Sequence, residues 1–92
     1  METFALELIA NEWMLIADGA AQQFVGLQLD ASAPCAIAIM TGEPELAHRD
    51  WLKLSKDGDA SFGVEIAEDR KVYARSLTEG EVVTIRGYRE AR

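Results

Sequence analysis

Residues 12–29 read EWMLIADGAAQQFVGLQL, two apolar segments that meet at Asp18-Gly19. An Asp-Gly pair between apolar runs predicts a β-hairpin, because glycine accepts the positive φ that tight hairpin turns require. Ala20 and Ala21 lengthen the connection, so a loop of about three to five residues fits the pattern equally well. We therefore expect a strand over residues 12–17, a turn, and a strand over residues 23–29.

The segment before this stretch alternates between apolar and polar residues. Within residues 3–9, Phe4, Leu6 and Leu8 share one face, which predicts a half-buried strand. Residues 12–17 are apolar on both sides after the first position, as in a strand covered on both faces within a sandwich or at a subunit contact. A helix over residues 3–17 is the alternative, because four large apolar residues have helical spacing: Leu6, Ile9, Trp13 and Ile16.

The remainder of the chain reads as short strands separated by turn residues. Strands are predicted over residues 35–40, 51–54, 61–66, 71–77 and 81–88, with turns at 30–34, 56–59, 68–70 and 78–80. The run CAIAIM over 35–40 is apolar throughout and predicts a central strand. The polar tail 89–92 is expected to fray.

One connection is unusually long. Residues 41–50, TGEPELAHRD, form a loop of about ten residues where about four to six is usual, so it is either functional or ordered by a neighbour. Eight short strands with turn signals about every ten residues predict an all-β fold. We expect a small antiparallel β-sandwich or a jelly-roll-like barrel, with residues 1–92 as a single domain.

Charge and composition exclude several partners. The net charge is −7, which repels phosphate backbones and anionic lipid, so neither nucleic acid nor a membrane surface is an expected partner. Cys35 is the one cysteine, so no intramolecular disulfide can form, which fits a reducing compartment. The sequence has no basic segment of a signal peptide and no run of about 18 apolar residues. We expect a soluble protein made in a cytoplasm.

Motifs for chemistry are sparse. Cys35 lies in an apolar run and has no cationic neighbour in the sequence that would lower its pKa. We therefore favour a packing role for Cys35 in the core over a catalytic role as a nucleophile with His48 as its base. One cysteine and one histidine cannot supply a zinc site. Asp57-Gly58-Asp59 begins like a calcium loop, but Phe62 stands where that loop needs glycine. We expect no enzyme, no cofactor and no metal.

Aromatic residues and arginine indicate where a partner could bind, because both are enriched in the cores of protein interfaces. Trp13 is expected in the core or at an interface, and Trp51, which follows the polar loop, is expected to be partly exposed. The interface candidates are Trp13, Trp51, Tyr73, Arg75 and Tyr88. A carbohydrate- or receptor-binding module that uses Trp51 and the loop His48-Arg49-Asp50 is the alternative function.

Two segments resemble small structural proteins of tailed bacteriophages and prophages. They are WMLIADGAA at 13–21 and VYARS at 72–76, with Gly42-Glu43-Pro44 matching a proline loop and residues 81–88 matching a last valine-rich strand. This chain departs from the group in its longer first strand, residues 3–9, and in its acidic surface. The resemblance implies a virion component, made in the bacterial host cytoplasm, that decorates the head or belongs to a head fibre or the tail. It implies a symmetric homo-oligomer, with a trimer as the specific expectation, that binds other virion proteins.

Overall fold

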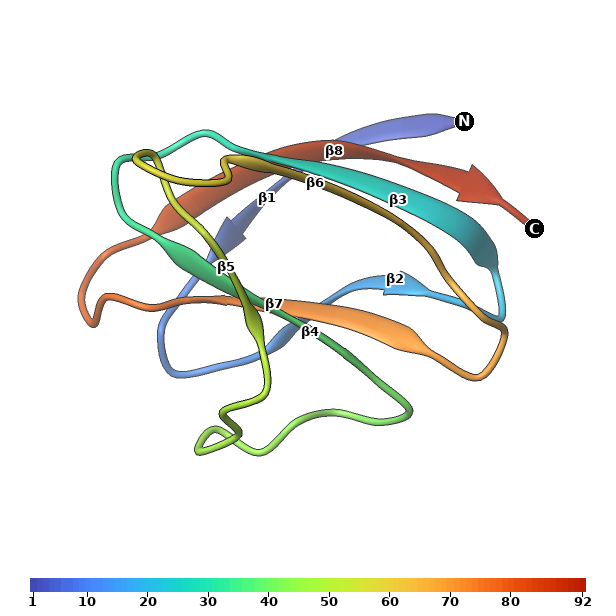
Figure 1. Cartoon of the computed structure of the whole chain (residues 1–92), viewed down its shortest axis with the longest axis horizontal. Coiled ribbons are helices and arrows are strands. Elements are labelled where there is room, and N and C mark those ends of the chain that lie inside the picture. Colours follow the sequence, from blue (N-terminus) through green and yellow to red (C-terminus); the bar gives the residue numbers. More distant parts are fainter.

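Eight antiparallel strands make up the protein in a computed structural model that describes residues 1–92 (Figure 1). The strands are β1 (Glu2–Leu8), β2 (Met14–Asp18), β3 (Gln22–Leu29), β4 (Cys35–Met40), β5 (Leu52–Leu54), β6 (Ser61–Glu65), β7 (Lys71–Ser76) and β8 (Val83–Ala91). The all-β prediction is confirmed, and the helical alternative for residues 3–17 is wrong. No helix long and apolar enough to cross a membrane is present.

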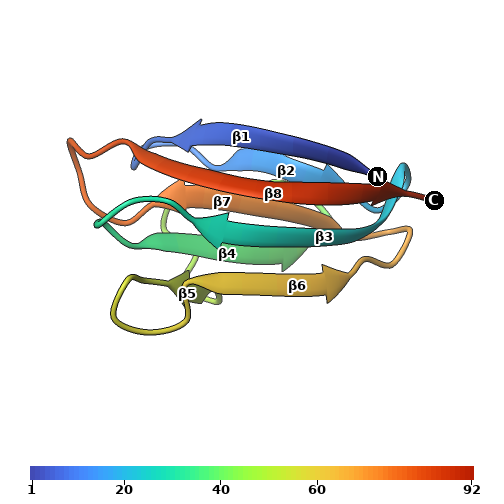
Figure 2. The same ribbon diagram turned by 90° about the horizontal axis from the view of Figure 1, so that it is seen from above.

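The strands form two four-stranded sheets that pack face to face (Figure 2). Sheet A has the order β1-β8-β3-β6 and sheet B has the order β2-β7-β4-β5. Consecutive strands lie in opposite sheets, except for β4 and β5, which pair with each other. This strand order is that of an eight-stranded jelly roll, and both sheets keep open edges, so the fold is a sandwich and not a closed barrel.

The predicted hairpin around Asp18-Gly19 is wrong. β2 pairs with β7, and β3 pairs with β6 and β8, so the connection between β2 and β3 passes from one sheet to the other. Gly19 does not have a positive φ; Gly80 does. Gly19 instead donates its backbone N–H to the carbonyl oxygen of Arg70 at 2.8 Å, and a Cβ there would collide with the carbonyl oxygen of Ala67. Glycine is therefore needed for close packing rather than for turn geometry.

The alternating patterns place the core side chains correctly. Strands β1, β3, β7 and β8 send predicted apolar residues between the sheets, including Leu8, Val25, Leu27, Val72 and Ile85. In β2 the register shifts between Leu15 and Ala17, so the neighbours Ile16 and Ala17 are both buried. A β-bulge of this kind turns two successive residues toward one face, and it explains part of the two-sided apolar pattern at residues 12–17.

The tail of the chain is ordered, contrary to the expectation that residues 89–92 fray. β8 continues to Ala91, which lies opposite Gln22 of β3. The guanidinium of Arg92 donates to the carbonyl oxygens of Gly19 and Ile66. Arg89 reaches across the sandwich to the carbonyl oxygen of Ile16 at 3.0 Å. Polar residues extend this strand because their charged ends find backbone acceptors on neighbouring segments.

Candidate functional site

A cluster of aromatic and small residues covers the outer face of sheet B. Trp13, Ala36, Ala38 and Tyr73 are buried there, on the side of β4 and β7 opposite to the core residues Ile37 and Ala74. Trp51 is half-buried against this cluster. The guanidinium of Arg75 lies 5.1 Å from the centre of the Trp13 ring. Four of the five interface candidates of the sequence are thus gathered at one place.

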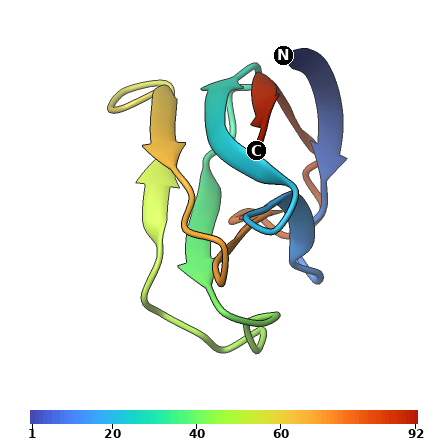
Figure 3. The same cartoon turned by 90° about the vertical axis from the view of Figure 1, so that its right-hand side faces the viewer.

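The loop between β4 and β5 closes over part of this cluster. The indole Nε1 of Trp13 donates to the carbonyl oxygen of Glu45 at 3.1 Å, and Pro44 of the same loop is buried. Figure 3 shows this loop extending from the lower ends of β4 and β5. The long loop is therefore ordered by a neighbour, and Trp13 and Tyr73, at 4% and 6% exposure, contact the chain itself.

A second feature is the β4–β5 corner, which we define as Ile37, Ile39, Asp50, Trp51 and Leu52. These residues line a hollow of about 370 Å³. Leu52 lies opposite the core residue Ile37 in the strand register, so it faces the same side of sheet B. Nevertheless Leu52 is 52% exposed and Ile39 is 37% exposed. The core is thus uncovered at this corner, next to the edge strand β5.

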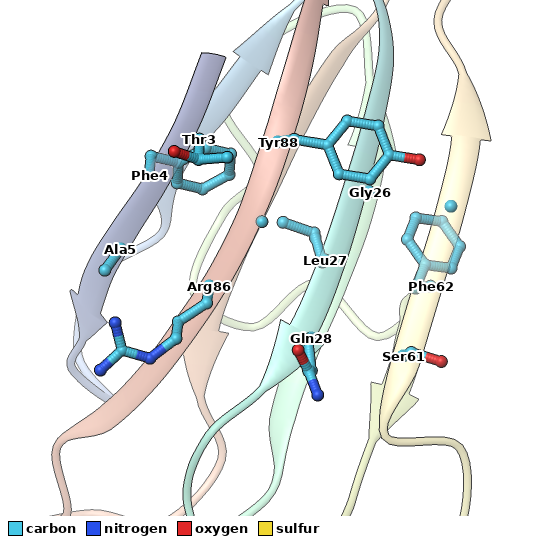
Figure 4. Close-up of a pocket in the computed structure, with 12 residues that line it drawn as sticks. Thr3, Phe4, Ala5, Gly26, Leu27, Gln28, Ser61, Phe62, Arg86 and Tyr88 are labelled. Atoms are coloured by element: carbon cyan, nitrogen blue, oxygen red, sulfur yellow. The ribbon is translucent and has the colours of Figure 1, made fainter. Parts of the chain in front are cut away.

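A third feature is a groove across the outer face of sheet A, with a volume of about 740 Å³ (Figure 4). Two rows of outward positions, set by the strand register, run across all four strands. The first row is Thr3, Tyr88, Gly26 and Gly63, and the second row is Ala5, Arg86, Gln28 and Ser61. Tyr88, the fifth interface candidate, therefore lies in the groove and not with the other four.

Glycines shape the groove. The ring of Tyr88 lies over Gly26, where a Cβ would come within 2.5 Å of the ring atom Cε1. The ring of Phe24 leans over Gly63 in the same way, and the two rings stack with centroids 5.7 Å apart. Tyr88 and Phe24 thus lie flat along the sheet, and their rings cover Gly26 and Gly63, respectively.

Most polar side-chain groups of the groove have no hydrogen-bond partner within the protein. Thr3, Gln28 and Ser61 are exposed, and their side chains make no hydrogen bond within the protein. Arg86 donates from Nε to the carboxylate of Asp30 at 2.8 Å, and its two Nη nitrogens have no partner in the chain. In this ion pair, which is exposed on both sides, Nε of Arg86 points toward Asp30.

The residues considered for chemistry lie apart. Cys35 is fully buried in the core, as its apolar surroundings in the sequence predict, and burial raises the pKa of its thiol to about 11. His48 lies in the β4–β5 loop, with Nε2 3.0 Å from the carbonyl oxygen of Asp50. No three His, Cys, Asp or Glu side chains gather into a group that could hold a metal ion. Asp57-Gly58-Asp59 belongs to the connection between β5 and β6, with Gly58 donating to the carbonyl oxygen of Ser55.

Sequence reasoning missed the groove residues Thr3, Gln28, Ser61 and Arg86. Each has an outward position in an alternating strand, which is the one signal that the sequence offers for it. Comparison with models of known protein families gives no match to this chain, and comparison with curated proteins gives none either.

Proposed function

We propose that this protein is a non-enzymatic structural component of a bacteriophage virion that associates with itself and with other virion proteins. The proposal includes assembly in the bacterial host cytoplasm and a place on the head, a head fibre or the tail. Its starting point is the resemblance at residues 13–21 and 72–76. The strand order is consistent with it, since double-sheet jelly rolls occur in viral capsid domains.

The observation that carries the proposal is the uncovered β4–β5 corner. Leu52 and Ile39 face the core side of sheet B but remain exposed, and Trp51 continues the apolar surface. Asp50 is the one charged residue among those that line the hollow. Burial of apolar surface favours association, so a second subunit seated here would cover the exposed part of the core.

The neighbouring edge strand supports the same contact. β5 pairs with β4 on one side, and the other side of its backbone has no strand partner in the sheet. An open edge beside an apolar surface offers backbone hydrogen bonds to another chain. A symmetric contact between β5 strands, or a cyclic arrangement such as the expected trimer, would use both features.

The test is the oligomeric state of the purified protein, measured by sedimentation velocity and light scattering from micromolar to near-millimolar concentration. We expect an oligomer that Leu52→Asp converts to monomer, because the charge would be buried in the contact. Val82→Asp, at a similarly exposed position in the β7–β8 connection, is the matched control and should leave the oligomer intact. A strict monomer at every concentration would overturn the self-association.

The virion assignment has a separate test. The genes beside the one that encodes this chain should specify terminase, portal and capsid proteins, and purified particles should contain the chain by mass spectrometry. A metabolic gene neighbourhood together with absence from particles would contradict the assignment even if the protein proves oligomeric.

A further inference from the structure

The groove on the outer face of sheet A is a second surface, separate from the β4–β5 corner. Its twelve lining residues come from β1, β3, β6 and β8, and none of them lines the corner. Thr3, Ala5, Gln28, Ser61 and Arg86 are all exposed, so the groove opens to solvent. We propose that this groove is a binding site for a neutral saccharide.

The shape of the groove fits an elongated ligand. Strands lie about 4.8 Å apart, so the path across four strands is roughly 14 Å long, and the two rows of side chains are about 7 Å apart along the strands. The outward positions Ala5 and Ser61 carry small side chains, whereas the rings of Tyr88 and Phe24 lie over Gly26 and Gly63. A narrow ligand can therefore lie close to the sheet, with Tyr88 on one side and Arg86 and Gln28 on the other.

The lining combines an apolar surface with hydrogen-bonding groups. The Tyr88 ring offers an aromatic surface, and its hydroxyl points away from β8 toward β6 (Figure 4). Gln28, Ser61 and Thr3 supply both donors and acceptors that have no partner in the chain. A sugar ring has the matching chemistry, because it presents C–H groups on one face and hydroxyl groups around its edge.

Charge disfavours ionic ligands. Arg86 is the one charged residue in the lining, and Asp30 pairs with it. Glu7, Glu65 and Glu90 occupy outward positions of the same sheet around the groove, and the whole chain has a net charge of −7. An anionic ligand would be repelled by this surface, and a cationic one would meet Arg86.

Backbone geometry argues against a peptide. Extended peptides bind β proteins by adding a strand to an open edge, where unpaired N–H and C=O groups are available. The groove instead runs across the strands on a face of the sheet, where β3 and β8 are paired on both sides. Side chains alone must hold the ligand, which favours a molecule with many hydroxyl groups.

The experiment is a titration of the isotopically labelled protein, followed by ¹H–¹⁵N NMR, with neutral trisaccharides of glucose, galactose, mannose and N-acetylglucosamine. We expect at least one of them to shift the amides of Gly26, Gln28, Ser61, Gly63 and Tyr88 together. Shifts confined to the β4–β5 corner, or no shifts with any of the four at millimolar concentration, would overturn the proposal. Tighter binding of a uronic acid trisaccharide would refute the neutral specificity.

Variants separate a bound sugar from general surface effects. Ala5→Phe and Ser61→Phe fill the groove at exposed positions and should weaken the saccharide by about tenfold or more, which is a loss of about 1.4 kcal/mol. Thr84→Ala changes the same face of β8 outside the groove and should bind as the wild type does. Equal binding by Ser61→Phe and Thr84→Ala would place the ligand elsewhere.

Discussion

Gly19 provides the sharpest test of how the two sheets are joined. Its α-carbon faces the β6–β7 connection so closely that a Cβ would collide with the carbonyl oxygen of Ala67 and lie 2.6 Å from that of Arg70. Both obstacles are backbone atoms, so no side-chain rotation can relieve them. Overpacking of this kind costs about 1–3 kcal/mol or more, and we expect Gly19→Ala to lie near 3 kcal/mol.

Two other glycines serve as controls for the predicted cost of Gly19→Ala. Gly42 has no atom within 4 Å of a built Cβ and no positive φ, so Gly42→Ala should be neutral or stabilise by about 0.5 kcal/mol. Gly80 has open space but a φ of 81°, so Gly80→Ala should cost about 1–2 kcal/mol through backbone strain alone. Asparagine tolerates this left-handed conformation, so Gly80→Asn should recover part of the loss.

Urea unfolding monitored by tryptophan fluorescence gives the free energies, and calorimetry gives the melting temperatures. At about 4–8 °C per kcal/mol, Gly19→Ala should melt roughly 12–24 °C below the wild type. The variant Gly19→Asn distinguishes close packing from a requirement for positive φ as the cause of the lost stability. If Gly19 lay in a hairpin turn with positive φ, asparagine would be tolerated there. Because Gly19 contacts the backbone instead, asparagine should lower the free energy of unfolding at least as much as alanine does. A Gly19→Asn protein as stable as the wild type would refute the account of close packing.

Three further predictions concern the ends and the core of the sandwich. Arg92→Ala should lower the free energy of unfolding by about 1–3 kcal/mol, because several carbonyl groups lose a charged donor; Arg70→Ala, which breaks an exposed ion pair, should cost under about 1 kcal/mol in the same assay. The buried Cys35 thiol should resist a thiol reagent until the protein unfolds. The pKa of this thiol rises from 9.0 to about 11 on folding, so its contribution to stability is complete below pH 9 and is lost as the pH rises toward 11. Over that range the free energy of unfolding should fall by about 2–3 kcal/mol more in the wild type than in Cys35→Ala. Trp13→Phe should remove the hydrogen bond to Glu45, costing about 0.5–1.5 kcal/mol, and should speed proteolysis within the β4–β5 loop.

The alternation of apolar and polar residues predicts well which side of a sheet each side chain lies on, but it predicts poorly which strands pair. The inward positions Phe62 and Val64 of β6 follow from a period of two, since each side chain simply points to one side of the sheet. The partner of a strand depends on the whole topology. In this fold most successive strands lie in opposite sheets, so the Asp18-Gly19 pair, which favours a local hairpin, lies at a crossing between sheets.

The candidate surfaces also depend on the strand pairing, which the sequence pattern does not predict. The groove joins residues near positions 3, 27, 62 and 87, and only the strand register brings them into two rows. Trp13 and Tyr73 stand out in the sequence as large aromatic residues, yet Trp13 donates to the loop of its own chain and Tyr73 is buried in the same cluster. Residue type therefore identified groups that bury surface, but it could not tell an internal contact from an external one.

The two outer faces of the sandwich differ in a way that links the proposals. Sheet B carries a loop that closes over its aromatic cluster, whereas sheet A leaves a shallow groove exposed. A groove held by a few side chains on an open surface binds a saccharide weakly, since most of the ligand stays in water. Association through the β4–β5 corner uses none of the groove residues, so each subunit of an oligomer would keep its groove free. Several weak sites on one assembly bind a polymeric surface far more tightly than any single site. The proposed self-association and the proposed saccharide groove would thus complement each other, because the first would supply the avidity that the second would lack.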